Sequence, residues 1–191
     1  MKYVPTLVGL PLALFAGAAL AHPGHDTVSF MSGFAHPIGG VDHLLAMLAV
    51  GLYAARQASG PRCLLPAGFI VAMLAGAALA AIGVALPAVE IGIATSVLVL
   101  GLLIAFVIKL PTAAALPLVA VFAACHGHAH HAEMGDGSLL GFTIGFVLAT
   151  ALLHTAGYAL ARWIPETRVA LIARRVAGAI IAGAGVLFLA S

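Results

Sequence analysis

The chain has 191 residues, of which 63% are hydrophobic and only 7% charged, and its mean hydropathy of +1.19 excludes a soluble globular domain. The formal charge of +2 comes from eight Lys and Arg against six Asp and Glu, and the basic residues are scattered among short loops, which gives no support to a nucleic-acid-binding surface. Apolar runs of about 20 residues recur without strand-like alternation. We therefore expect an all-α, polytopic membrane helical bundle.

The first 21 residues are typical of a secretory signal peptide. Lys2 supplies a short positive region, an apolar stretch follows, and Ala19-Leu20-Ala21 is a small-x-small cleavage signal. We expect cleavage after Ala21; the alternative is an uncleaved first span. The mature chain then begins near His22 and His25, which either collect metal loosely or form a solvated tail.

Six apolar stretches follow and predict a single transmembrane domain over residues 22–191. They cover residues 37–55, 64–86, 91–108, 112–126, 139–161 and 176–190. Pro37 is expected in the first turn of its helix, where the missing N–H costs nothing. Short loops between the stretches leave no room for a linker or a second domain.

Positive charge predicts how these spans are oriented. Every Lys and Arg after the signal peptide is expected in the loops that follow the first, third and fifth spans: Arg56, Arg62, Lys109, Arg162, Arg168, Arg174 and Arg175. Cytoplasmic loops carry such an excess, so both mature termini are expected on the periplasmic side of a bacterial inner membrane. Cys63 and Cys125 then lie near opposite faces, which disfavours a disulfide between them.

The first cluster of metal-ligating residues stands at the outer end of the first span. His36 and His43 project to nearly one helical face but are separated by about 10 Å of rise on a straight helix. Gly39-Gly40 can relieve that separation by bending the first turn. Asp42 is either a ligand from a distorted turn or a partner that fixes a histidine tautomer.

A second cluster, at the end of the fourth span, shares the membrane depth of the first. If the helix continues, His126, His130 and Glu133 fall on one face at spacings of i, i+4 and i+7. His128 and His131 point elsewhere and are treated as accessory groups. Ionisable residues are expensive in a bilayer, so two such clusters at one depth predict a functional metal site.

Three further residues each have two possible roles. His154 lies deep in the fifth span, nearer the cytoplasmic side, and is either a second metal station or a structural histidine. Glu90 begins the third span, where it either adds a carboxylate or complements the helix dipole. Cys125, beside His126, is either a soft ligand or a small packing residue.

These residues resemble the signatures of a known family. His36-Pro37-x-x-Gly40-x-Asp42-His43-Leu44, His126-Gly127-x-Ala129-His130-x-x-Glu133 and Leu152-Leu153-His154 with Gly157 are similar to motifs of the HupE/UreJ nickel permeases. The resemblance implies uptake of nickel, and in some members cobalt, to supply hydrogenase or urease. It assigns metal recognition to His36, Asp42, His43, His126, His130 and Glu133. His131 departs from the pattern, where a small residue such as Gly is expected.

The residues favour a transporter over an enzyme. Histidine and carboxylate ligands suit Ni²⁺, Co²⁺ or Zn²⁺, and the chain has no phosphate-binding loop of the nucleotide-hydrolysing type. We therefore expect facilitated or potential-driven import through the lipid bilayer, with the ion as substrate. The alternative is an intramembrane zinc hydrolase acting on a lipid or an amide, in which Ser32 joins the histidine clusters.

Overall fold

The computed structural model describes residues 29–57, 61–133 and 138–191, so the predicted signal peptide and His22 and His25 lie outside the described residues. Every regular element within those ranges is an α-helix, which confirms the predicted fold class. In chain order they are α1 (Phe30–Gly39), α2 (Val41–Ala54), α3 (Pro61–Ala81), α4 (Val89–Ala105), α5 (Thr112–Glu133), α6 (Leu139–Trp163) and α7 (Arg168–Ala190).

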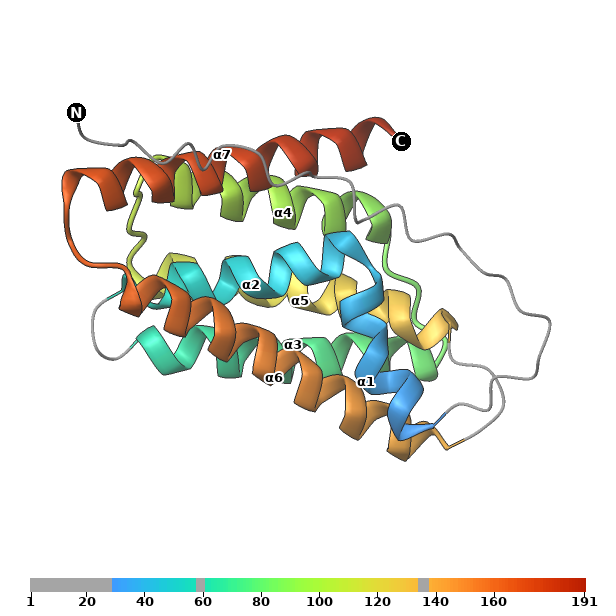
Figure 1. Ribbon diagram of the computed structural model, residues 1–191. Coiled ribbons are helices and arrows are strands. Elements are labelled where there is room, and N and C mark those ends of the chain that lie inside the picture. The colour runs from blue at the N-terminus through green and yellow to red at the C-terminus, as the bar shows by residue number, and fades with distance from the viewer. Residues whose placement is uncertain (1–28, 58–60, 134–137) are drawn as a thin grey trace, which may run out of the picture.

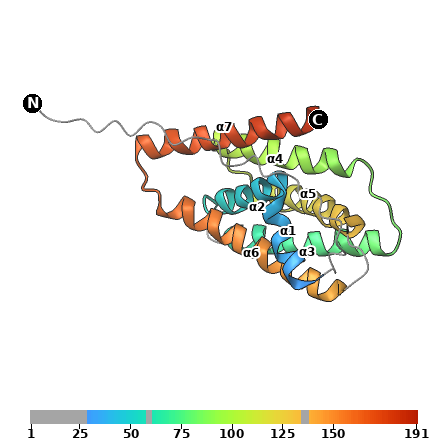
Figure 2. The ribbon, with the colours of Figure 1, turned by 45° about the vertical axis from the view of Figure 1, so that its right-hand side comes forward.

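The helices form a bundle with α2 and α5 in its middle (Figures 1 and 2). Helices α4 and α7 pack together on one side, and α3 and α6 lie on the other. Helix α5 packs mainly on α3, whereas α6 packs mainly on α1 and α2. Helix α2 thus contacts neighbours on both sides, which places its residues at the centre of the molecule.

The number of membrane spans depends on how two elements are read. Four helices, α3, α5, α6 and α7, are long and apolar enough to cross a membrane. Helices α1 and α2 reach that length only together, and they are bent by 83° at their junction. Helix α4 is apolar but has 17 residues. Six spans therefore remains a prediction, in which the bent pair and α4 each count as one.

The start of the first helix differs from the expectation. Helix α1 begins at Phe30, because Ser29 and Ser32 form a capping box in which each hydroxyl accepts a hydrogen bond from the other residue's backbone N–H. Pro37 therefore lies inside α1, and its predicted place in a first turn was wrong. The helix ends at Gly39, and the next residue, Gly40, has an extended backbone (φ −90°, ψ 117°) that separates α1 from α2.

Small residues let helices approach closely, as in other membrane bundles. Between α4 and α7, a side chain on Gly101 would meet the backbone of Ala182, and one on Gly178 would meet the backbone of Ala105. The outward face of α7 carries exposed apolar side chains, including Ile172, Ile180 and Leu187. One face of α7 is thus shaped for close packing and the other is suited to lipid.

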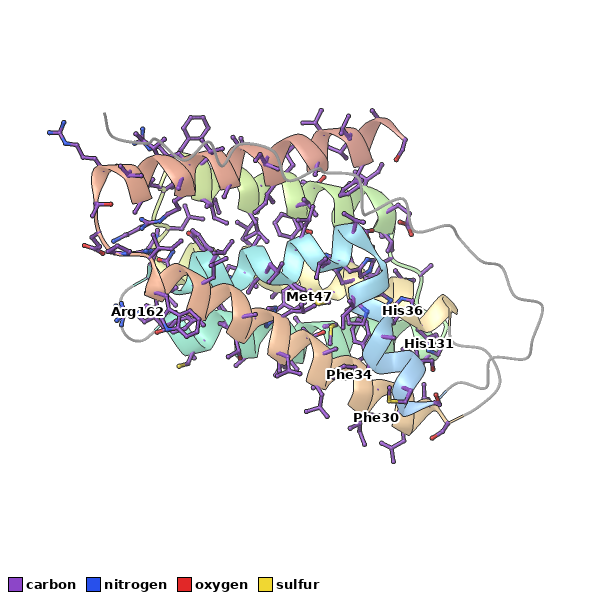
Figure 3. The ribbon with its side chains drawn as sticks, viewed as in Figure 1. Phe30, Phe34, His36, Met47, His131 and Arg162 are labelled. Atoms are coloured by element: carbon purple, nitrogen blue, oxygen red, sulfur yellow. The ribbon has the colours of Figure 1, made fainter. Side chains whose placement is uncertain are left out.

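Charge separates the two ends of the bundle. Every Lys and Arg of the described residues lies at or within about two turns of the end that holds the α2–α3, α4–α5 and α6–α7 connections, here called the inner end. The opposite, outer end holds the α1–α2 junction; Figure 3 shows Arg162 and His36 at the two ends. At the inner end, the Arg56 guanidinium donates to Glu166 Oε1 (3.1 Å) and to the Ala161 carbonyl (2.5 Å), which joins α2 to the α6–α7 turn.

The close approach of α4 and α7 can be tested with two glycines of the same helix. Gly178→Ala is expected to lower stability by about 1–3 kcal/mol, because the added methyl meets α4 backbone that cannot move aside. Gly183→Ala is the matched control, since nothing lies within 4 Å of its added methyl. Thermal unfolding in detergent, followed by circular dichroism, measures both. Equal melting temperatures for the two variants would contradict the packing.

Candidate metal centre

The junction of α1 and α2 brings the first histidine cluster together. On a straight helix, His36 and His43 would be about 10 Å apart along the axis. The 83° bend at Gly40 brings their ring centroids to 6.2 Å, with the rings roughly perpendicular. The expected bend at the glycine pair is therefore present, and it turns His36 back toward the residue that begins the next helix.

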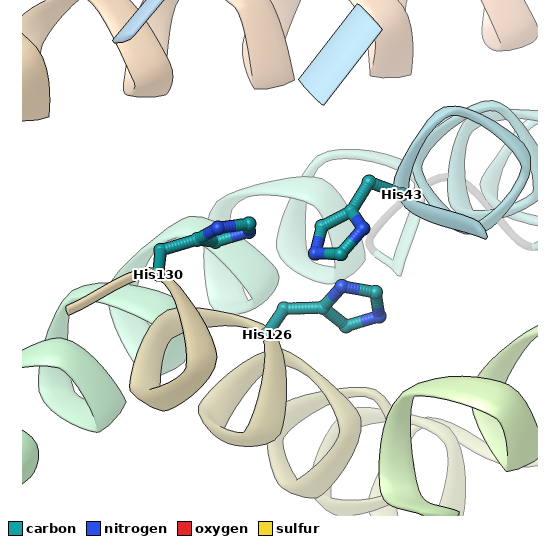
Figure 4. A group of neighbouring side chains, drawn as sticks. All are labelled: His43, His126 and His130. Carbon is teal, nitrogen blue, oxygen red and sulfur yellow. The ribbon is translucent and has the colours of Figure 1, made fainter. Parts of the chain in front are cut away.

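Helix α5 supplies the second cluster from one face. It continues past His126 to Glu133, so His126 and His130 stand one turn apart, with 0% and 2% of their surfaces exposed. The His43 ring centroid lies 4.8 Å from that of His126 and 4.4 Å from that of His130. These three residues, the histidine trio, each offer one nitrogen, and the three nitrogens lie within 4.8 Å of one another. Figure 4 shows the rings converging from α2 and α5.

Asp42 orients the His43 ring. The Asp42 Oδ1 atom lies 2.7 Å from His43 Nδ1 and also accepts the His43 backbone N–H at 2.8 Å. Because a carboxylate accepts and does not donate, this contact puts the ring proton on Nδ1. His43 Nε2 is then left with a lone pair; it is buried and, among the described residues, has no hydrogen-bond partner. A carboxylate behind a ligating imidazole is a common way to orient a metal ligand.

Ser96, which lies in α4, orients the His126 ring. Its hydroxyl donates to the Ile93 carbonyl (2.6 Å), and its oxygen lies 3.0 Å from His126 Nε2. Since the hydroxyl proton is already committed, the oxygen accepts and the imidazole proton resides on Nε2. His126 Nδ1 is left with a lone pair and, within the described part of the chain, has no hydrogen-bond partner. Two rings of the trio are thus held in tautomers that offer a free lone pair.

Aromatic rings close the site toward α6. The His130 ring lies 4.3 Å from that of Phe146 and 4.6 Å from that of His36. His36 also contacts Phe142, with centroids 5.8 Å apart. His36 lies outside the trio and is half-buried, so it covers the site on its outer side.

Two cavities lie at the outer end, and the first of them reaches the trio at His43. The first, about 410 Å³, is lined by His36, Asp42, His43 and Glu90, among others; we call it the outer cavity. The second, about 390 Å³, shares Asp42 and Glu90 with it. Glu90 is exposed and Asp42 half-buried, so two carboxylates line the outer cavity together with the half-buried imidazoles of His36 and His43.

The remaining sequence candidates lie in different surroundings. Glu133 ends α5, and its side chain lies outside the described part of the chain. His128 Nε2 forms a hydrogen bond with the connection between α3 and α4. It either accepts from the Leu86 N–H (3.2 Å) or donates to the Val84 carbonyl (3.0 Å). Cys125 lies beside Gly92 of α4, away from the trio. His154 lies deeper, beyond Phe69, and is outside the trio as well.

Sequence reasoning did not identify two residues of this region. Ser96 is the hydroxyl that orients His126, and Phe69 of α3 packs against the same ring with centroids 5.7 Å apart. Thr95 and Ser96 are the two hydroxyl residues of a long apolar run, and they were a signal that such a partner exists, because a hydroxyl buried in a membrane helix needs a hydrogen bond. Phe69 carries no such signal, since phenylalanine is ordinary in an apolar helix.

Comparisons with known proteins cover nearly the whole chain. The family described as HupE / UreJ protein matches residues 10–188. Protein HupE of Rhizobium leguminosarum bv. viciae is 38% identical over 186 residues, which make up 97% of this chain and 97% of that protein. No solved structure matches the chain. Both histidine clusters fall within the matched residues.

The part played by Ser96 can be tested through metal affinity. Ser96→Ala removes the oxygen that accepts the His126 Nε2 proton. The proton can then move to Nδ1, so Nδ1 is no longer held as the nitrogen with the lone pair. The affinity for Ni²⁺ is therefore expected to fall about 10- to 100-fold. Isothermal titration of the purified protein with Ni²⁺ measures this. Thr143→Ala is the control, because the Thr143 hydroxyl bonds only its own helix, at Leu139. Unchanged affinity in Ser96→Ala would rule out this orienting role.

Proposed function

Because this chain belongs to the HupE/UreJ family, we propose that it is a permease that imports Ni²⁺, with Co²⁺ as a second substrate, across a bacterial inner membrane. The observation that carries the proposal is the histidine trio, in which His126 and His130 are buried, and in which His43 Nε2 and His126 Nδ1 are buried atoms with no hydrogen-bond partner among the described residues. Neutral imidazoles suit these late transition metals, and the affinity order places Ni²⁺ above Co²⁺. The ion is the substrate of the protein.

The substrate path begins in the outer cavity. The carboxylates of Glu90 and Asp42 attract a hydrated divalent cation and raise its local concentration. His36 at the cover of the site and His43 behind it then replace water molecules of the ion. His126 and His130 complete the exchange from α5, and Glu133 at the end of that helix is proposed as a further carboxylate on the path.

Asp42 acts through His43 in this scheme. Its carboxylate holds the Nδ1 proton of His43, so that Nε2 faces the ion, and it offsets part of the charge that the ion brings. Three neutral imidazoles from two helices bind without forming a closed cage. Such a site suits transport, because binding has to be favourable enough for entry and weak enough for release.

Membrane potential supplies the driving force in this proposal. The arginine-rich inner end is placed in the cytoplasm, with both termini of the mature chain in the periplasm. A divalent cation that crosses toward a negative interior gains about 4.6 kcal/mol for each 100 mV, twice the value for a single charge. No nucleotide hydrolysis by this chain is needed. The imported ion would supply a nickel enzyme such as hydrogenase or urease.

The proposal predicts potential-dependent flux that depends on the trio. Proteoliposomes containing the purified chain are expected to accumulate Ni²⁺ under an inside-negative potential, and more slowly without one. His43→Ala should reduce uptake to the level of empty liposomes, because the ion loses the ligand that joins α2 to α5. The matched control is His131→Ala, which removes a histidine of the same helix turn as His130 that is not part of the trio.

The contrary results separate the two functions that the histidines allow. Uptake that persists in His43→Ala would remove the trio from the transport path. Metal that remains bound to the purified protein, without flux under any gradient, would refute the permease. The next assay would then be hydrolysis of lipid and amide substrates in the presence of Zn²⁺.

A further inference from the structure

A separate cavity opens at the inner end of the bundle, between α3 and α6. Its volume is about 360 Å³, and it is lined by Arg62, Cys63, Ile70, His154, Thr155 and Tyr158, among others; we call it the inner cavity. Helix α3 packs mainly on α5 and α6 mainly on α1 and α2, which leaves this groove between them. None of these residues belongs to the trio or the outer cavity.

His154 is a polar residue that lines this cavity and has no hydrogen-bond partner in the part of the chain that the structure describes. Only 2% of its surface is exposed, and neither ring nitrogen has a hydrogen-bond partner among the described residues. Buried polar groups are nearly always paired, so an unpaired imidazole indicates an unfilled role. The backbone at this position is fixed, since a side chain on Gly51 of α2 would meet the His154 carbonyl. The His154 backbone is thus packed closely against α2, while its ring contacts Phe69 and has no hydrogen-bond partner within the described ranges.

One aromatic ring contacts both His154 and the histidine trio. Phe69 is fully buried, and its centroid lies 5.0 Å from that of His154 and 5.7 Å from that of His126. The two imidazoles thus contact the same phenyl ring. An ion that passed from the outer site toward the inner end would reach His154 next.

Cys63 supplies a second group of suitable chemistry. It is an exposed thiol in the first turn of α3 and lines the same cavity as His154. Thiolate and imidazole together bind Ni²⁺, Co²⁺ and Zn²⁺. We propose that His154 and Cys63 form an inner metal-binding station, from which the ion leaves toward the arginine-rich end. This inference rests on the proposed function, because it names the second stop of the same substrate.

The charge at the mouth of the cavity favours release. Arg62 borders the cavity, and its guanidinium is held nearby by a hydrogen bond from Nε to the Gln57 carbonyl (3.0 Å). A fixed positive charge weakens the binding of a cation at the same opening. The inner station therefore holds its ion more loosely than the outer trio, which gives the path a direction.

Alkylation of Cys63 tests the station directly. In a Cys125→Ser background, Cys63 is the single cysteine of the two in the chain. The purified protein in detergent is treated with N-ethylmaleimide in the presence and absence of Ni²⁺. A metal-bound thiolate is not available as a nucleophile, so saturating Ni²⁺ is expected to slow alkylation by about tenfold or more.

Three variants identify the partner of Cys63. The protection is expected to be lost in His154→Ala and also in His154→Gln, which keeps a polar side chain of similar size and guards against misfolding. It is expected to persist in a His43→Ala, His130→Ala double variant, because the inner station does not use the trio. Protection that survives both His154 substitutions, or that disappears with the trio, would overturn the inference.

The same samples separate this inference from the proposed function. Loss of Ni²⁺ uptake in His43→Ala, without any Ni²⁺ protection of Cys63, would support the permease and refute the inner station. Protection that depends on His154, in a chain that carries no ion under any gradient, would refute the permease and leave a second metal site. His154→Ala that transports at the rate of the unaltered chain would remove the station from the path.

Discussion

The candidate site depends on the break between α1 and α2. A continuous helix would hold His36 and His43 on one face but too far apart to act together. Gly40 interrupts the backbone, and the 83° bend turns α1 across the bundle so that His36 covers His130 while His43 faces His126. A backbone broken at membrane depth is tolerated where it lines a polar cavity, and the outer cavity lies at this junction.

The orientation of the rings depends on two groups behind them. Asp42 and Ser96 come from different helices, and each accepts one imidazole proton, from His43 and His126. The lone pairs are thereby directed inward before any ion arrives, which lowers the entropy that binding has to overcome. Asp42 and Ser96 thus fix the tautomers of His43 and His126 in advance, and the site remains open toward the outer cavity.

The sequence predicted those features that follow from periodicity and charge. The spacing of His126 and His130 predicted that both would share one face of a helix, and the segregation of Lys and Arg predicted one inner end. It did not predict the angle at Gly40, the start of α1 at Phe30, or the contact between Ser96 and His126. These depend on how non-neighbouring helices meet, which no local spacing encodes. The role of Asp42 was left open between ligand and partner for the same reason.

Phe69 gives the proposed path its central constraint. Its buried ring contacts both His126 and His154. In the proposed path, an ion that moved from one imidazole to the other would pass this ring, so the proposal calls for a movement of the Phe69 side chain or of α3. Helix α3 is packed mainly on α5, the helix that carries His126 and His130. In the proposed permease, binding of an ion by the two α5 histidines would therefore act on the helix that carries Phe69 and Cys63, because α3 and α5 pack together over most of their length.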